Sequence, residues 1–108
     1  MLCLGRKAGE SIIIGEDLKI TVIGIDKMKY AKTRKNQVHL RVERMIGGET
    51  ITTRFFKRVG ADLDIREDVK LAILRVSQNQ VSLGIKAPKT VAVDREEIRL
   101  SKLTKGIN

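Results

Sequence analysis

Apolar and polar residues alternate along most of the chain, with the period of two that is typical of β-strands. The run NQVHLRVER, residues 36–44, shows this most clearly, because Val38, Leu40 and Val42 alternate with polar side chains. Turn residues, such as the Gly-Gly pair of MIGGET, separate the runs. The segments predicted to form strands are MLCLGRK, SIIIG, LKITVIGI, NQVHLRVER, ETITTRFFKR, LDIRED, VKLAILRVS, NQVSLGIKAP and TVAVD.

The C-terminal segment carries the signals of a helix start. Asp94 can cap a helix, and Glu96 and Glu97 then lie in the first turn, where the helix dipole favours carboxylates. We expect a helix over about residues 95–104, which Gly106 could end. The apolar side chains expected to dock it are Ile98, Leu100 and Leu103.

Composition and charge narrow the class of protein. The 108 residues suit one domain, and the 42% apolar content excludes wholesale disorder. A net charge of +9 and a pI near 10.1 favour a polyanionic partner, nucleic acid first and an anionic membrane second. No apolar run approaches the roughly 18 residues of a spanning helix. The single cysteine, Cys3, is expected to be a buried thiol and fits a cytoplasmic location.

The sequence contains an internal repeat. At an offset of 51, residues 4–25 align with residues 55–76 without a gap, and Gly9 falls on Gly60. At an offset of 43, NQVHLRV aligns with NQVSLGI, so the first copy has eight extra residues within DKMKYAKTRKN. Chance similarity between alternating strands is the alternative. Duplication is favoured, and it predicts one domain, 1–108, with a first copy at 1–48, an extended hairpin at 26–36, and a second copy at 49–108.

Two segments together resemble the carbon storage regulator family, CsrA/RsmA, which are small bacterial RNA-binding translational regulators. They are MLCLGRKAGESIIIGEDLKITVIGI at the start and NQVSLGIKAPKTVAVDREEI near the end. The resemblance covers the first 25 residues and roughly residues 62–100. It implies a mainly β fold, a small β-barrel or sandwich of mixed sheets with one C-terminal helix.

The resemblance also implies a function. The family's ordinary member has five strands and a helix and forms an interlocked homodimer, in which the first strand of one protomer and the fifth strand of the other form each RNA site. It recognises GGA, often in a hairpin loop of an mRNA 5′ leader, and blocks the ribosome as a repressor. The matching positions here are Leu4, Arg6, Lys7, Ala87, Pro88, Val91, Ala92, Val93, Arg95 and Glu96.

The chemistry of these residues agrees with that role. A strand edge offers fixed N–H and C=O groups to guanine, while Arg6, Lys7 and Arg95 can neutralise phosphates. Other interpretations exist for several positions. Arg95 could instead pair with Glu96 or Glu97. Glu96 could serve the helix dipole, and three apolar positions could serve core packing, namely Leu4, Val91 and Val93.

Three departures from the family pattern affect the expected RNA sites. Asp94 replaces a common His and puts a negative charge beside RNA, and Gly5 replaces a common Thr or Ser. The duplication leaves the first copy without a fifth strand, so residues 49–56 are expected to serve as both first and fifth strand. We expect a single-chain pseudo-dimer with one good RNA site and one degraded site. The alternative is a homodimer in which the middle of the chain is an insertion.

Basic residues outside the motif are candidates for auxiliary RNA contacts, although a basic hairpin tip is often simply solvated. They are Lys27, Lys29, Lys32, Arg34 and Lys35 in the hairpin and Lys57 and Arg58 further on.

Other functional classes have less support. The sequence has no phosphate loop, nucleophile elbow or paired cysteines, so an enzyme or a cofactor is not expected. His39 has no partner at metal-ligand spacing and is expected to be an exposed strand residue. Two alternatives stay open: a protein-interaction module that binds by strand addition, with an antagonist of the flagellar assembly factor type as a possible partner, and a non-specific RNA chaperone.

Overall fold

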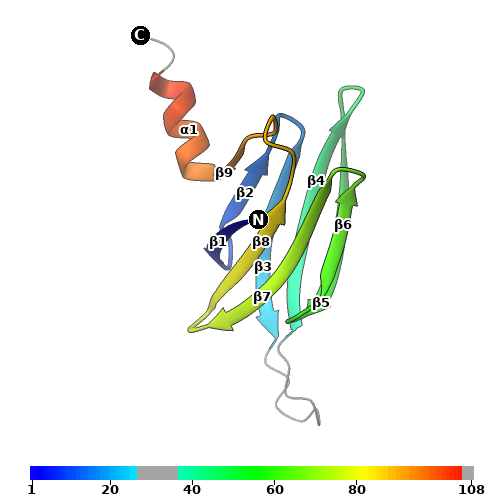
Figure 1. The fold of residues 1–108 in the computed structure, drawn as a ribbon, viewed down its shortest axis with the longest axis vertical. Coiled ribbons are helices and arrows are strands. Elements are labelled where there is room, and N and C mark those ends of the chain that lie inside the picture. Colours follow the sequence, from blue (N-terminus) through cyan, green and yellow to red (C-terminus); the bar gives the residue numbers. More distant parts are fainter. Residues whose placement is uncertain (27–36, 106–108) are drawn as a thin grey trace.

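The computed structural model describes residues 1–26 and 37–105. It contains two antiparallel sheets and one C-terminal helix (Figure 1). The elements are β1 (Leu2–Lys7), β2 (Ser11–Ile14), β3 (Leu18–Asp26), β4 (Gln37–Ile46), β5 (Glu49–Arg58), β6 (Asp62–Arg66), β7 (Val69–Ser77), β8 (Gln80–Lys86), β9 (Val93–Arg95) and α1 (Glu96–Lys105). The mainly β prediction is confirmed, although the strand expected over TVAVD is shorter.

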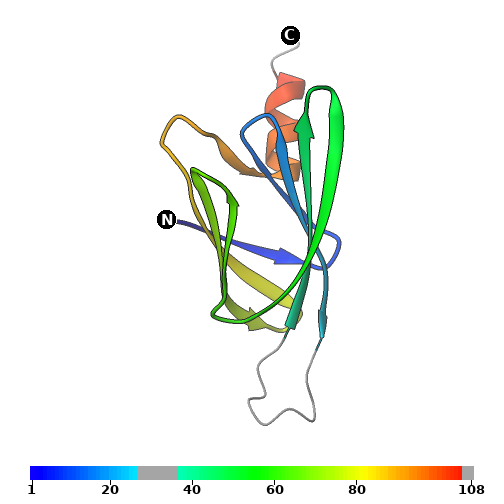
Figure 2. The same ribbon diagram turned by 90° about the vertical axis from the view of Figure 1, so that its right-hand side faces the viewer.

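The strand order is β1-β8-β7-β6 in one sheet and β5-β4-β3-β2-β9 in the other. All the described pairings are antiparallel. The predicted mixed sheets are therefore mixed only in the sense that each sheet combines strands from both copies. The sheets form two layers around one aliphatic core (Figure 2). Its fully buried side chains include Ile12, Ile14, Val22, Leu40, Leu71, Ile73 and Leu83.

The internal repeat is present in the backbone itself. The pairing of β3 with β4 has a bulge between Val22 and Gly24, and that of β7 with β8 has one between Ile73 and Arg75, 51 residues later. The Gly9 N–H donates to the Val22 carbonyl at 2.7 Å, and its counterpart Gly60 donates to Ile73 at 2.7 Å. The two copies therefore share pairing, turns and irregularities, which confirms the duplicated architecture.

The copies are interleaved rather than side by side. β1 of the first copy pairs with β8 of the second, with Leu4 opposite Leu83. β5 of the second copy pairs with β4 of the first, with Phe55 opposite Leu40, and these positions correspond through the repeat. A two-residue turn, Gly47-Gly48, joins β4 to β5, and both glycines have the positive φ that such hairpin turns favour.

Within residues 1–26 and 37–105, the fifth strand occurs once. β9 pairs with β2, whereas β6, the repeat counterpart of β2, ends its sheet with no strand on its outer edge among the described residues. The expectation that residues 49–56 serve two strand roles is wrong. They lie in β5, which pairs with β4 and takes the first-strand position alone.

The helix begins as predicted but is anchored differently. Glu96 and Glu97 lie in its first turn. Since the helix begins at Glu96, Arg95 rather than Asp94 precedes it, and the Asp94 carboxylate accepts hydrogen bonds from Arg99 and Lys102. The predicted apolar docking is wrong, because the three side chains are 46–60% exposed; they are Ile98, Leu100 and Leu103. Ion pairs hold the start of the helix instead, and Gly106 lies outside the described residues.

Candidate nucleic-acid interface

The outer edges of β1 and β9 border one hollow of about 230 Å³, called here the β1–β9 groove. Its lining comes from the start of β1, the end of β8 and the segment that leads into β9: Met1, Leu2, Ile85, Lys86, Ala87, Pro88, Lys89, Val91 and Val93. Four of the predicted site residues line this groove, namely Ala87, Pro88, Val91 and Val93. The structure thus brings together two segments more than 80 residues apart in the sequence.

Arg6, near the end of β1, lies outside the lining of the groove and has a structural role. Its side chain is only 4% exposed, and its guanidinium donates to the two carboxylate oxygens of Glu97 at 2.9 and 2.7 Å. It also donates to the Ser11 carbonyl at 3.2 Å. This ion pair lowers the pKa of Glu97 to about 2 and raises the pKa of Arg6 above its usual value. Arg6 therefore joins β1 to α1, rather than standing free to neutralise a phosphate.

Arg95, like Lys7, is a motif cation whose side chain has no hydrogen bond or ion pair among the described residues. It is exposed, and its backbone pairs opposite Ile12. The alternative pairing with Glu96 or Glu97 is not made. Lys19 binds Glu96 at 2.7 Å and Arg6 binds Glu97, so both carboxylates already have partners.

The remaining motif residues divide between surface and core. Lys7 is exposed, and its backbone N–H donates to the Glu10 carboxylate at 2.7 Å. Leu4, Val91 and Val93 are partly buried against the core, so the packing interpretation holds for each of them. Ala92 is exposed, and its carbonyl accepts the Gly15 N–H at 2.7 Å.

Lys86 and Lys89 line the groove, although the sequence analysis did not single them out. Both are exposed and flank Ala87 and Pro88. The signal was present in the sequence, because the APK turn is bounded by lysines in KAPK. These two lysines give the lining of the groove a positive charge, which suits a phosphate backbone. Lys7 and Arg95 lie on the adjoining strands, outside the lining.

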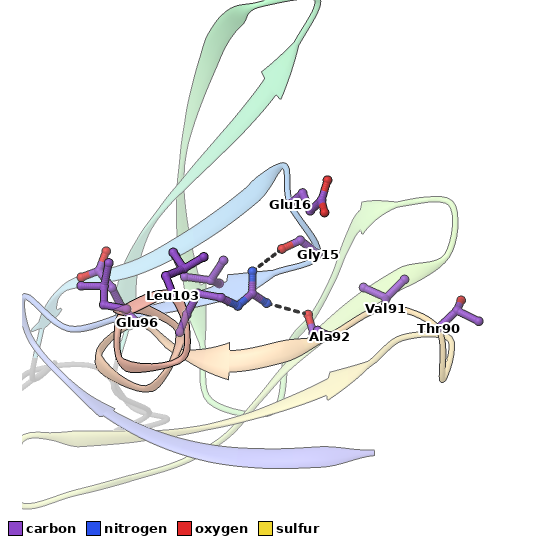
Figure 3. Close-up of a pocket in the computed structure, with 10 residues that line it drawn as sticks. Gly15, Glu16, Thr90, Val91, Ala92, Glu96 and Leu103 are labelled. Carbon is purple, nitrogen blue, oxygen red and sulfur yellow. Dashed lines mark hydrogen bonds between the residues drawn. The ribbon is translucent and has the colours of Figure 1, made fainter. Parts of the chain in front are cut away.

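Arg99 fixes the other side of β9. Its guanidinium donates to the Gly15 carbonyl at 2.6 Å and to the Ala92 carbonyl at 3.3 Å (Figure 3). It also binds Asp94 at 2.9 Å, and Lys102 binds the same carboxylate at 2.8 Å. These two hydrogen bonds, with Lys102 contributing most, lower the pKa of Asp94. Because two cations meet its charge, Asp94 repels an approaching phosphate less than the sequence suggested.

Two of the auxiliary candidates lie away from this groove. Lys57 and Arg58 end β5, at the opposite edge of the five-stranded sheet, where they correspond to Arg6 and Lys7. The five cations of the predicted hairpin tip lie outside the described residues; they are Lys27, Lys29, Lys32, Arg34 and Lys35.

Two expectations about single residues are corrected. His39 is partly buried, its Nε2 is enclosed, and its ring stacks on Phe56 with a centroid distance of 4.2 Å. Cys3 is exposed rather than buried. Among residues 1–26 and 37–105, no group of three or more His, Cys, Asp or Glu side chains could hold a metal ion.

Comparison with known proteins identifies the family. The family model described as CsrA, global regulator protein family, matches residues 1–44 and again residues 56–103. The chain belongs to the CsrA family. The translational regulator CsrA of Hydrogenovibrio crunogenus is 48% identical over 44 residues, which cover 41% of this chain and 63% of the relative. The match to the CsrA family model in two segments agrees with the duplication seen in the strand pairing.

No solved structure gave a significant match to the chain. Within its described part, α1 is neither long nor apolar enough to cross a membrane.

Proposed function

We propose that this CsrA-family chain is an RNA-binding translational regulator that recognises GGA in the loops of mRNA leader hairpins and blocks ribosome access. The observation that carries the proposal is the β1–β9 groove, where the first strand of one copy and the fifth strand of the other lie together. Single-stranded loops present unpaired base edges, which strand backbones and short side chains can reach. Lys86 and Lys89 supply charge in this groove, Arg95 at the end of β9 supplies a side chain that can contact a base, and the outer edge of β9 supplies backbone groups.

We further propose that one chain is a pseudo-dimer with one complete RNA site. Each copy's first strand pairs with the other copy's fourth strand in matching register, as expected when two protomers are fused. β9 completes the edge beside β1, whereas the corresponding edge beside β5 has no fifth strand among the described residues. One chain therefore binds one GGA hairpin. A homodimer with the middle of the chain as an insertion would bind two hairpins per dimer.

The test is binding of a hairpin with GGA in its loop, compared with the same hairpin carrying GCA, at two salt concentrations. Arg95→Ala should weaken GGA binding by roughly tenfold or more, since a side chain that contacts a base is worth about 1–3 kcal/mol. Arg75→Ala is the matched control, because Arg75 is exposed on β7 and does not line the groove. Equal binding of both hairpins would favour the non-specific chaperone, and no binding at low salt would rule out the RNA function.

Stoichiometry comes from a saturating titration combined with the mass of the complex. One hairpin bound to one chain supports the pseudo-dimer. A complex of two chains and two hairpins would support the homodimer, if separating the two chains also abolishes RNA binding.

A further inference from the structure

The outer edge of β6 has the backbone of a strand-binding site. Through the repeat, β6 corresponds to β2, and β2 carries β9 with Ile14 opposite Val93 and Ile12 opposite Arg95. β6 ends the four-stranded sheet, near one side of the molecule in Figure 1. An antiparallel strand could therefore pair with β6 in the register that β9 uses on β2.

A hollow beside β6 corresponds to the place that the valines of the fifth strand occupy in the other half. It measures about 230 Å³ and is lined by Val42, Arg44, Ile46, Ile51, Thr53, Phe55 and Ile65. Through the repeat, Ile65 corresponds to Ile14, which pairs with Val93. Thr53 and Val42 correspond to Leu2 and Ile85, which line the β1–β9 groove together with Val91 and Val93. The hollow thus has the position and the lining to receive two alternate apolar side chains of an added strand.

Two further features show that this edge has no partner among the described residues. Ile46 and Ile51 at the rim of the hollow are 46% and 49% exposed. The Nε of Arg44 is buried and has no hydrogen-bond partner within the described chain. An unsatisfied buried N–H is costly, and a carbonyl of an incoming strand is a suitable acceptor for it.

The charge of the edge selects the occupant. Asp62 and Asp64 are exposed on β6 and alternate with the buried Leu63, although the chain as a whole carries +9. Asp64 has a single long contact, 3.9 Å to the exposed Lys70. These carboxylates repel a phosphate backbone, and they would face each other if two β6 edges paired. A basic polypeptide is complementary to them.

We propose that the β6 edge binds an extended segment of another protein by strand addition, independently of the RNA site. The segment has apolar residues at two alternate positions, the second of which lies opposite Ile65. Lys or Arg follows at the positions opposite Asp64 and Asp62. The apolar residues fill the hollow beside Phe55, and the basic residues pair with the two carboxylates on the outer face.

The test uses the whole chain and a labelled peptide, KTVAVKRK, which is residues 89–96 with Asp94→Lys and Glu96→Lys. Its second valine lies opposite Ile65 and its last two lysines lie opposite Asp64 and Asp62. We expect a saturable rise in fluorescence anisotropy, with slower hydrogen exchange confined to residues 62–66. Two further peptides carry N-methyl groups at alternate residues, so that the methylated positions face β6 in one peptide and face away from it in the other. If the main chain pairs with β6, the first peptide should not bind and the second should bind normally.

Charge reversal provides the matched pair of variants. Asp64→Lys should weaken peptide binding by about threefold or more, because like charges opposite each other on paired strands are unfavourable. Glu16→Lys makes the same charge reversal at an exposed carboxylate of the first copy, whose repeat counterpart is Glu67. It should leave peptide binding unchanged. Both variants should bind a GGA hairpin as the unmodified chain does, which confirms their fold.

Three results would overturn the proposal: no saturable binding, equal binding by the Asp64→Lys and Glu16→Lys variants, or equal binding by both N-methylated peptides. A GGA hairpin that displaces the peptide and protects residues 62–66 would also overturn it, and would make this edge a second RNA site.

Discussion

Arg6 and Glu97 form a two-pronged ion pair across 91 residues of sequence, with donor–acceptor distances of 2.7 and 2.9 Å. The pair joins the first strand of one copy to the helix of the other. Because Arg6 is almost fully buried, the pair holds β1 and the start of α1 in a fixed relation. Arg95, at the end of β9, immediately precedes this helix. Arg6 and Glu97 thus hold the start of α1 against β1, whereas the side chain of Arg95 forms no hydrogen bond or ion pair with the described residues.

Replacing Glu97 with Gln should loosen this edge. The variant removes the closest counter-charge of the buried Arg6 guanidinium and leaves Glu10, at 3.9 Å, as its only ion-pair partner among the described residues, which is unfavourable for a buried cation. We expect a Tm lowered by several degrees and hydrogen exchange that is several-fold faster at residues 93–97. Glu49→Gln, at an exposed carboxylate that has no ion pair with the described residues, is the control and should leave both unchanged. An unaltered Tm in Glu97→Gln would contradict the positioning role.

The same pair predicts a pH dependence of stability. The pKa of Glu97 is lowered from 4.5 to about 2 by its hydrogen bond to Arg6, so the folded state favours the ionised carboxylate. Its contribution is complete above pH 4.5 and is lost as the pH falls towards 2. In thermal unfolding at a series of pH values, the Tm difference between the unmodified chain and Glu97→Gln should be constant from pH 7 to about 5. It should shrink between 4.5 and 2, and a difference that persists at pH 2 would show another origin.

Lys86 and Lys89 should contribute charge without sequence preference. Replacing either with Ala should weaken binding of GGA and GCA hairpins by the same factor and lower the salt dependence by about one released counterion. Arg95→Ala should instead reduce the ratio between the two hairpins. Titrations at several salt concentrations separate these outcomes. Loss of GGA preference in the lysine variants would assign them a role in base recognition.

Gly5 can be tested by restoring the hydroxyl residue that is common in the family. A Cβ at position 5 would collide with the side-chain amide of Gln80, so Gly5→Thr forces that side chain to move. Gln80 is exposed and the colliding atom is the far end of its flexible side chain, so that side chain can move away at little cost. We expect a change of no more than about 0.5 kcal/mol in the free energy of unfolding. Chemical denaturation of the unmodified chain, Gly5→Thr, Gln80→Ala and the double variant measures it, and a larger loss that Gln80→Ala relieves would show that the Gln80 side chain is held in place.

Much of the fold could be predicted because the internal repeat shows the same pattern twice, so that each copy checks the prediction made from the other. Gly9 and Gly60 lie in turns where φ is positive in both copies, and a pattern that recurs at such positions reflects backbone geometry rather than composition. The alternation of Val38, Leu40 and Val42 likewise predicted which side of β4 is buried.

The contacts between distant segments could not be predicted from pattern alone. Periodicity shows which face of an element is apolar, but it does not show that Arg6 would meet Glu97 rather than solvent. The helix was misjudged for a similar reason. Ile98 and Leu100 are two positions apart, which places them on nearly opposite sides of a helix, so they cannot both face the sheet. The vacant edge of β6 became visible only when the strand order showed where β9 pairs.

The Gly47-Gly48 turn has a consequence for how this molecule assembles and changes over time. It makes the contact between β4 and β5 local in sequence, so the two copies meet at a very high effective concentration and their association does not depend on dilution. In a symmetric pair of identical chains, every substitution appears at both equivalent positions. Here a substitution alters one copy alone, so one edge can acquire a new partner while the other keeps its old one.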